Sequence, residues 1–405
     1  MEPKICAYAL GHLNHQLDDN MISACFRCAA KLGDHSQQVL SKVKNSDAAK
    51  EHRMTLMRGE WPEGCNSCKN FEEIGICSTR LDGLTLPRLG LDLENYNAST
   101  GEIAHVKSIE LRFGNECNLS CRHCSPIYSS RWESIIRSNP SMLKSILGRD
   151  PDPIPKNGLS AEYIRDILEN IVPNVGHIAF AGGEPLYQTQ HYDFINAIPA
   201  EHAAHIELLY VTNGTILNLK TYNILEMWKK FKKVVVIVST DGVGDKYEYF
   251  RTGAKWAIVE RNIKSIKAAG YWVGTEITCS VYQMFYLTET FDYLYDSGIS
   301  DWVSSSIVQF PTLINPQIIP HDVKLLLLEK WENYLCTITN AEKLRRATAI
   351  GKHVVNYMMG DNTDISSTEV TWQDFANSVY AADRLFNTDV AKSMPLLAEC
   401  LPKPQ

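Results

Sequence analysis

Residues 112–132 read "RFGNECNLSCRHCSPIYSSRW" and place Cys117, Cys121 and Cys124 at C-x3-C-x2-C spacing. Clustered thiolates of this kind are ligands for iron–sulfur clusters or for zinc. Three such thiolates can hold three irons of a [4Fe–4S] cube and leave the fourth iron open to another ligand. Taken by itself, the spacing is equally compatible with zinc bound by a distant fourth ligand.

The sequence around this motif predicts alternating strands and helices. Helical patterns such as residues 160–172 and 257–270 lie between the β-rich runs, and this alternation favours parallel strands with right-handed crossovers. We therefore expect an open or partial α/β barrel, in which chemistry gathers at the carboxyl ends of the strands. The cysteine motif follows the first strand and falls at that end. The six expected strands are 105–113, 175–182, 205–212, 232–239, 271–279 and 301–310.

Three further strand ends carry residues suited to binding an amino acid. The second strand ends in "AFAGGEPLY" (179–187), whose glycines let a ligand approach the backbone and whose Glu184 offers a carboxylate to an ammonium group. The third ends in "VTNG" (211–214) and the fourth in "STDG" (239–242), with Arg251 shortly after. Arg251 could hold a carboxylate through two hydrogen bonds. Each turn alone is a weak signal, but all of them in this order are specific.

With these four motifs, residues 105 to about 315 resemble the radical S-adenosylmethionine (radical SAM) enzymes, and the chain looks like the twitch/SPASM-type members of that superfamily. The resemblance implies a partial (β/α)6 barrel and a [4Fe–4S] cluster on Cys117, Cys121 and Cys124. It also implies that the amino and carboxylate groups of S-adenosylmethionine bind the open iron. The cofactor-binding residues carried over by position are Gly182, Gly183, Glu184, Asn213, Ser239, Asp241, Arg251 and His123.

A second group of cysteines lies near the N-terminus and includes two C-x2-C pairs, which indicate a metal site. Resemblance to twitch-like modules implies an auxiliary [4Fe–4S] cluster, although the middle pair of that pattern is normally adjacent. Zinc and a module without metal are the alternatives, and for zinc the gap between the two pairs is longer than in common zinc ribbons. In the middle pair the ligand is Cys25, Cys28 or both. Cys77 could be a ligand, a redox-active thiol or a bystander. The predicted ligands are Cys6, Cys25, Cys28, Cys65 and Cys68.

Composition sets the remaining expectations. The chain has 405 residues, 44% hydrophobic and 21% charged, which is typical of a globular protein. A net charge of −7 gives no sign of nucleic-acid binding. We identify neither a secretion signal nor a membrane-spanning run in the sequence. We therefore expect a reducing, cytoplasmic compartment. We predict a cysteine-rich module (1–95), a radical SAM core (96–317) and a helical C-terminal extension (318–405).

The resemblance implies reductive cleavage of S-adenosylmethionine to methionine and a 5′-deoxyadenosyl radical, which abstracts a hydrogen atom from a substrate. An electron donor such as flavodoxin or ferredoxin is the implied partner. The auxiliary cluster favours a peptide or protein substrate, with a sugar or nucleoside as the rival. A non-catalytic iron–sulfur or zinc protein is the alternative from another class. The sequence identifies neither the substrate nor a general acid, base or hydrogen donor.

Overall fold

The computed structural model describes residues 2–404 except 74, 76, 87–88, 90, 140–143, 147, 149–157, 310 and 361–369. The chain divides into two compact units, each built from segments that are separate in the sequence. The first unit comprises Met1–Glu116, Pro155–Val211 and Asn218–Val235. The second comprises Cys117–Ile154, Thr212–Leu217 and Val236–Gln405. The division predicted at residues 95 and 317 stays a prediction.

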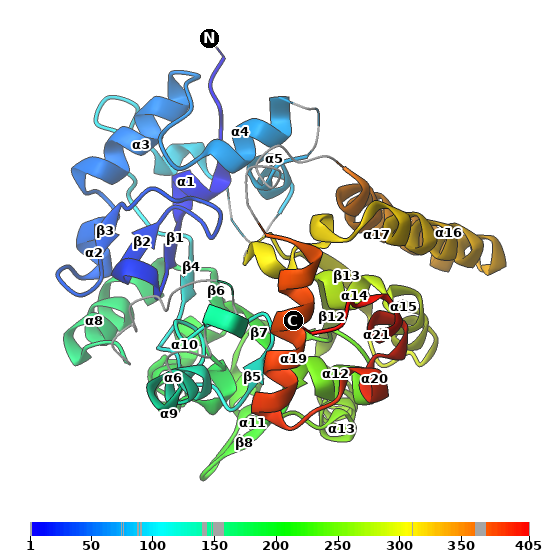
Figure 1. Ribbon diagram of the computed structural model, residues 1–405. Coiled ribbons are helices and arrows are strands. Elements are labelled where there is room, and N and C mark those ends of the chain that lie inside the picture. The colour runs from blue at the N-terminus through cyan, green and yellow to red at the C-terminus, as the bar shows by residue number, and fades with distance from the viewer. Residues whose placement is uncertain are drawn as a thin grey trace. The chain divides into compact units, whose positions relative to one another are not determined.

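The first unit contains a sheet in the order β7-β6-β4-β1-β2-β3 (Figure 1). The pairs β1–β4, β4–β6 and β6–β7 are parallel, whereas β1–β2 and β2–β3 are antiparallel. All four residues of β6 are buried, as expected for a parallel strand covered on both faces. The strands are β1 (His12–His15), β2 (Met21–Ser23), β3 (Gly33–Asp34), β4 (Ser108–Leu111), β6 (His177–Phe180) and β7 (Glu207–Thr212).

The strands of the second unit are β10 (Lys233–Ser239), β12 (Trp272–Cys279) and β13 (Trp302–Ile307), in the order β13-β12-β10. β12 and β13 are parallel. In β10 every second residue, namely Val234, Val236 and Val238, is buried, which follows from the two-residue period of a strand. A short antiparallel ribbon of β5 (Ser120–Cys121) and β11 (Arg251–Thr252) forms a separate sheet.

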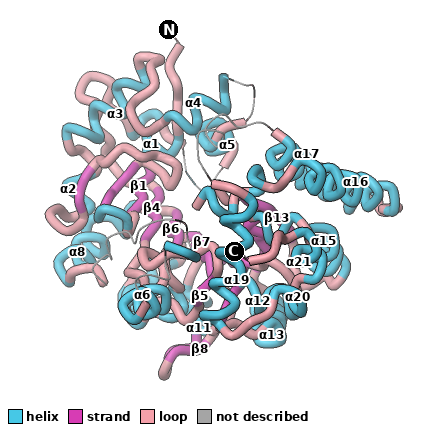
Figure 2. The backbone as a smooth tube through the Cα atoms, viewed as in Figure 1, coloured by secondary structure: helices cyan, strands magenta, loops and turns pink. Residues whose placement is uncertain are grey.

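Helices accompany the strands in both units (Figure 2). Several begin at a serine or threonine cap: Ser46 before α3, Ser129 before α6, and Thr371 in a capping box with Asp374 before α19. The first unit has α1 (Ala7–Gly11), α2 (Leu40–Val43), α3 (Asp47–Met57), α4 (Asn66–Glu73), α5 (Thr79–Leu84), α8 (Ala161–Asp166), α9 (Thr189–Ala197), α10 (Ala200–Ala203) and α11 (Ile224–Met227). The second has α6 (Ser130–Ser138), α12 (Asp245–Phe250), α13 (Trp256–Ala268), α14 (Val281–Met284), α15 (Leu287–Asp296), α16 (His321–Thr337), α17 (Ala341–Met359), α19 (Trp372–Phe386), α20 (Val390–Ser393) and α21 (Pro395–Cys400).

The predicted fold class is confirmed. The six expected strands are β4, β6, β7, β10, β12 and β13, and the described residues after 318 are mostly helical. One expectation differs, because the N-terminal region, which shows little strand pattern, contributes β1, β2 and β3. Among the described helices, none has the length and hydropathy needed to cross a bilayer.

Candidate functional site

The cysteine loop is fixed by the helix that follows it. Cys117 donates its backbone N–H to Ser130 Oγ at 3.2 Å, and Trp132 Nε1 donates to the carbonyl of Cys121 at 2.9 Å. Cys117 and Cys121 are buried, and Cys124 is half-buried. Helix α6 therefore holds the backbone of the cysteine loop and helps to fix the positions of the loop's thiols.

Arg251 lies against the middle cysteine. It stands opposite Cys121 in the β5–β11 ribbon, and its Nη1 lies 3.8 Å from Cys121 Sγ. Its Nη2 forms a buried ion pair with Asp241 Oδ2 at 2.7 Å. Asp241 also accepts a hydrogen bond from the backbone of Thr278 at 2.8 Å, which fixes the carboxylate. The structure thus brings together Cys121, Asp241 and Arg251, three of the predicted site residues.

Charge and burial oppose each other at this contact. Burial raises the pKa of the Cys121 thiol to about 11, although the Arg251 cation acts in the other direction. Burial lowers the pKa of Arg251, but the charge of Asp241 and the interaction with Cys121 outweigh it, so the pKa is raised and Arg251 stays a cation. A fixed cation beside a buried sulfur favours the thiolate, which is the form that binds metal.

Asn213 is placed at the first cysteine. Its side-chain N–H group donates to Asn118 Oδ1 at 3.0 Å and lies 4.0 Å from Cys117 Sγ. Its Oδ1 accepts from the backbone of Thr215 at 2.9 Å, so the side chain is held at both ends. The turn after the third strand thus lies against the cysteine loop, whereas the predicted role of Asn213 in cofactor binding stays a prediction.

His123 and Ser239 occupy the same unit. The ring of His123 stacks on Phe250, with centroids 5.1 Å apart and an interplanar angle of 14°. Burial lowers the pKa of His123 to about 4, which keeps the imidazole neutral near pH 7. Ser239 is the last residue of β10, two positions before Asp241, and is half-buried. The flat, neutral ring of His123 suits stacking against an aromatic ligand.

The glycine turn belongs to the first unit, where it is tied to the start of the cysteine loop. Gly183 N–H donates to the carbonyl of Gly114 at 3.2 Å, and Glu184 N–H donates to that of Glu116 at 2.8 Å. A Cβ at position 183 would lie 2.4 Å from the Glu116 oxygen, so only glycine fits here. Gly182 has a φ of +110°, which also favours glycine. Glu184 is 1% exposed and accepts from the backbone of Leu186 at 3.0 Å.

Arg122, between the second and third cysteines, is a site residue that the sequence does not reveal. It is 2% exposed and pairs with Asp383 of α19 at 2.9 Å. Its Nε donates to the carbonyl of Tyr249 at 2.9 Å, and its guanidinium lies 3.8 Å from the Tyr249 ring centroid. The C-terminal helix therefore helps to position the cysteine loop.

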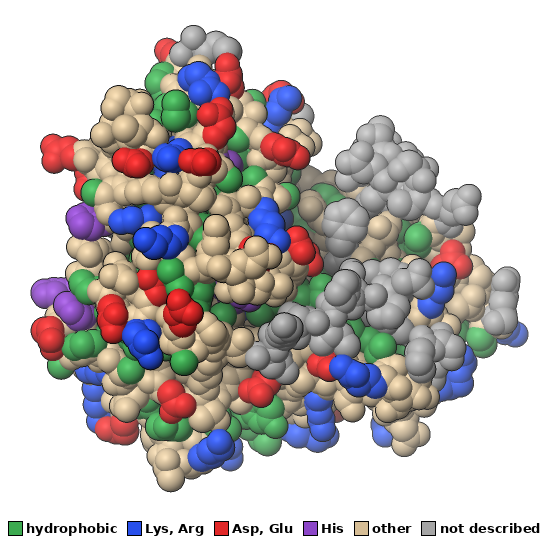
Figure 3. Space-filling view, turned by 90° about the vertical axis from the view of Figure 1, so that its left-hand side faces the viewer, with side chains coloured by type: hydrophobic (Ala, Val, Ile, Leu, Met, Phe, Trp, Pro, Cys, Tyr) green, Lys and Arg blue, Asp and Glu red, His purple; other side chains and the backbone are tan. Residues whose placement is uncertain are grey.

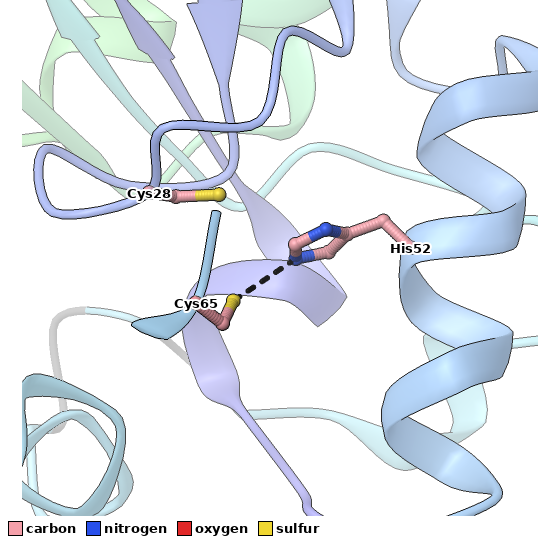
Figure 4. Close-up of side chains that lie close together, drawn as sticks. All are labelled: Cys28, His52 and Cys65. Carbon is pink, nitrogen blue, oxygen red and sulfur yellow. Dashed lines mark hydrogen bonds between the residues drawn. The ribbon is translucent and has the colours of Figure 1, made fainter. Parts of the chain in front are cut away.

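A separate group of side chains of the types that bind metals lies in the N-terminal part of the first unit. The ligand atoms of Cys28, His52 and Cys65 all lie within 4.8 Å of one another (Figure 4). Cys28 and Cys65 are predicted ligands, whereas His52 was not predicted. The sequence feature that could have indicated His52 is its position on the buried face of α3, together with Ala49 and Leu56. The other side chains of that face serve packing.

The other N-terminal cysteines interact electrostatically with this group. Burial raises the pKa of Cys25, and the neighbouring Cys28, Cys6 and Cys68 raise it further. Burial raises the pKa of Cys6 to about 11, with a smaller contribution from Cys68. A hydrogen bond between Cys65 and Cys28 lowers the pKa of Cys28 and raises that of Cys65, so the pair favours one thiolate.

Cys77 stands apart from these thiols in character. It is exposed, and its Sγ lies 3.8 Å from the carbonyl of Ser78. Its exposure is inconsistent with the role of a buried bystander.

The cysteine loop fits an iron–sulfur cluster by its donors. It offers three thiols, two of them buried, with Arg251 and Asn213 directed at the sulfurs of Cys121 and Cys117. Thiolates that bind different irons of one cube stand further apart than ligands that share one ion. Among the described residues, the group gathered within 4.8 Å is the N-terminal one, so the three sulfurs of the cysteine loop do not all lie within that distance of one another.

Comparison with known proteins assigns this part of the chain to a family. Residues 111–297 match the model of the Radical SAM superfamily, and the chain therefore contains a domain of that superfamily. A comparison with curated protein sequences gave no match.

Solved structures with similar folds include anSMEcpe with bound AdoMet, at 17% identity over 57% of this chain and 61% of that one, with a TM-score of 0.38. Streptococcus suis SuiB bound to S-adenosylmethionine is 18% identical over 67% of this chain and 59% of that one, with a TM-score of 0.37. SuiB bound to its precursor peptide SuiA is 15% identical over 73% and 62%, with a TM-score of 0.36. The chain thus matches less than two thirds of each.

Proposed function

We propose that the protein is a radical SAM enzyme that cleaves S-adenosylmethionine reductively and abstracts a hydrogen atom from a peptide or protein substrate. The observation that carries the proposal is the buried Asp241–Arg251 pair directed at the sulfur of Cys121, within a domain that matches the Radical SAM superfamily.

The residues of the chain would bind and orient the cofactors. Cys117, Cys121 and Cys124 would hold three irons and leave one position open. The Gly182–Glu184 turn would face the methionyl amino group, and Ser239, Asp241 and Arg251 would contact the ribose and carboxylate. The ion pair with Asp241 already holds the Arg251 side chain in place. A carboxylate would therefore bind a positioned guanidinium rather than a mobile one. Asn213 is a weaker contact, and His123 would stack near the adenine.

When bound, the [4Fe–4S] cluster and S-adenosylmethionine supply one-electron cleavage of the sulfonium to methionine and a 5′-deoxyadenosyl radical. The electron would come from a flavodoxin or ferredoxin. The contribution of the chain is burial, because the residues nearest to the sulfurs are closed to water and a reactive radical must be shielded from solvent. We place this activity in the cytoplasm.

A second metal centre in the N-terminal region supports a peptide or protein substrate, since relatives with such modules often modify peptides. We propose an auxiliary [4Fe–4S] cluster held by cysteines from the set Cys6, Cys25, Cys28, Cys65 and Cys68, with zinc as the alternative. The buried, mutually interacting thiols support a metal centre of either kind. Figure 3 shows acidic and basic side chains interspersed on one face of the molecule.

The test is formation of 5′-deoxyadenosine by anaerobically reconstituted protein with a chemical reductant. We expect Cys121→Ala to abolish it while the protein stays soluble. Cys336→Ala serves as the matched control, because Cys336 is exposed and should leave cleavage unchanged. Cleavage at the wild-type rate by Cys121→Ala would overturn the assignment of the site.

A further inference from the structure

We propose that His52 is a metal ligand, and that Cys28, His52 and Cys65 together bind one tetrahedral ion of the zinc class through two sulfurs and one imidazole nitrogen. This inference rests on the proposal that the N-terminal module holds metal, and it does not depend on the radical chemistry. It departs from the auxiliary-cluster assignment in both the ligand set and the number of metal ions.

The geometry of the three side chains suits a single ion. The three ligand atoms lie within 4.8 Å of one another, and Cys65 Sγ is 3.8 Å from His52 Nε2. Figure 4 shows the three side chains pointing toward a common centre from separate segments. Ligands that share one tetrahedral ion approach each other this closely, whereas those of a cube are separated by its irons and sulfides.

The chemistry of the donors also suits zinc. Two thiols and one imidazole are a common ligand combination for this ion. Cys28 is 3% and His52 6% exposed, so the donors are closed to most solvent. The neighbouring cation, Arg53, does not compete for this centre, because it donates to the carbonyls of Gly101 and Lys44.

The backbone holds the two cysteine loops together before any metal binds. Ala29 N–H donates to the carbonyl of Gly64 at 3.1 Å, which joins the residue after Cys28 to the residue before Cys65. Gly64 has a φ of +82°, and a Cβ there would lie 2.2 Å from Ala30 N. The close approach of the loops thus requires glycine, and a site fixed in this way needs little reorganisation on binding.

A fourth ligand position remains, and access to it exists. A pocket of about 620 Å³ is lined by His52 together with Ala29, Trp61 and Glu63, among others. An ion could enter from this side. Cys25, whose backbone carbonyl accepts from the N–H of Cys28 at 3.1 Å, or a water molecule would complete the tetrahedron. The two alternatives differ in sulfur count, which X-ray absorption distinguishes.

The experiment uses the full chain with Cys117, Cys121 and Cys124 changed to alanine, so that only the N-terminal centre is observed. The protein is loaded with Zn²⁺ or Co²⁺, and metal content, affinity in competition with a chelator and X-ray absorption are measured. We expect one ion per chain with sulfur and nitrogen ligands. His52→Ala should weaken Co²⁺ binding by at least about 10-fold, since even outer-shell partners contribute 10–100-fold.

Two further variants keep the test decisive. His105→Ala removes an exposed histidine of the same unit and should bind metal as the parent does. His52→Cys replaces the nitrogen with a thiolate, so it should retain the ion and give all-sulfur coordination, even if His52→Ala does not fold. Unchanged affinity in His52→Ala, or no change of ligands in His52→Cys, would overturn the inference.

The same measurements separate this inference from the auxiliary-cluster proposal. About four irons with matching sulfide and only sulfur ligands after anaerobic reconstitution would reject the His52 site and support the auxiliary cluster. If the parent binds neither zinc nor iron, the N-terminal metal centre fails as a whole. Formation of 5′-deoxyadenosine by the protein with an intact cysteine loop tests the radical activity independently.

Discussion

Replacing Gly183 with alanine tests whether the glycine turn is held rigidly against the start of the cysteine loop. The new Cβ would lie 2.4 Å from the Glu116 carbonyl oxygen, 1.0 Å inside the 3.4 Å at which ordinary contact begins. The next two atoms, Asn115 C and O, are at 2.7 and 2.9 Å and are also backbone. No flexible side chain can move aside, so two backbone segments must separate.

The magnitude has two parts. Overpacking of this kind costs about 1–3 kcal/mol. Separation of the segments also weakens the hydrogen bonds from Gly183 to Gly114 and from Glu184 to Glu116, each with a net value of about 1 kcal/mol. We therefore expect Gly183→Ala to lower the free energy of unfolding by about 2–4 kcal/mol. If the turn binds S-adenosylmethionine, its affinity should fall by at least about 10-fold, because 1.4 kcal/mol corresponds to that factor.

Urea unfolding and equilibrium dialysis with S-adenosylmethionine measure the two effects. Gly176→Ala is the matched control, because it precedes the same strand, β6, and its Cβ would meet nothing closer than the Lys107 oxygen at 4.0 Å. The control should behave like the wild type. A Gly183→Ala protein with wild-type unfolding and wild-type affinity would refute the idea that this backbone contact is rigid.

Two further predictions concern buried charge. Burial lowers the pKa of His191 to about 3, so between pH 6.5 and 3 the unfolded chain binds a proton that the folded chain does not, and stability falls as pH falls. Between pH 6.5 and 5 the free energy of unfolding should fall by about 2 kcal/mol for this reason. Urea titrations at the two pH values should show that this fall is missing in His191→Gln and retained in the control His202→Gln. Asp383→Asn leaves the Arg122 cation buried without its partner and should cost about 3–5 kcal/mol by urea unfolding. Arg345→Gln, which breaks an exposed pair with Glu342, should cost less than about 1 kcal/mol, and equal effects would contradict the argument from burial.

The parallel strands of the barrel could be predicted because their local pattern and their environment agree. The run that becomes β10 is rich in valine, and alternate residues, all of them valines, are buried. β1 has no such pattern, since its residues are "HLNH", yet all four are buried. They form a strand because β4 provides a parallel partner, with His12 opposite Ser108, and no local signal reports that pairing.

The site divides in the same way. The cysteine loop and the glycine turn are predictable, because each is a short motif whose chemistry depends on neighbouring residues. Arg122 could not be assigned, because its partner Asp383 lies 261 residues away. His52 was hidden for another reason: a histidine on the buried face of a helix has the same sequence pattern whether it packs or binds metal, and only the approach of Cys28 and Cys65 distinguishes the two.

The predicted boundary at residue 95 leads to a last test, because the first unit contains residues on both sides of it. β1 pairs in parallel with β4, and Lys107 N–H donates to the carbonyl of Gly11 at 2.7 Å. Asn14 Oδ1 accepts from Arg112 at 2.7 Å on the same edge. Removal of residues 1–95 would therefore leave β4 as an unpaired edge strand with its buried side chains exposed on one side.

We expect the chain of residues 96–405 to aggregate, because an exposed, apolar edge strand is a template for pairing with other chains. Light scattering and size-exclusion chromatography after expression at low temperature would measure this. The control is the full chain with Cys117, Cys121 and Cys124 changed to alanine. These substitutions leave the pairing of β4 with β1 intact, so this protein should not aggregate. A monomeric 96–405 chain that binds iron would instead show that the N-terminal cysteine-rich module is a separable domain. It would also show that β4 folds without β1 as its partner.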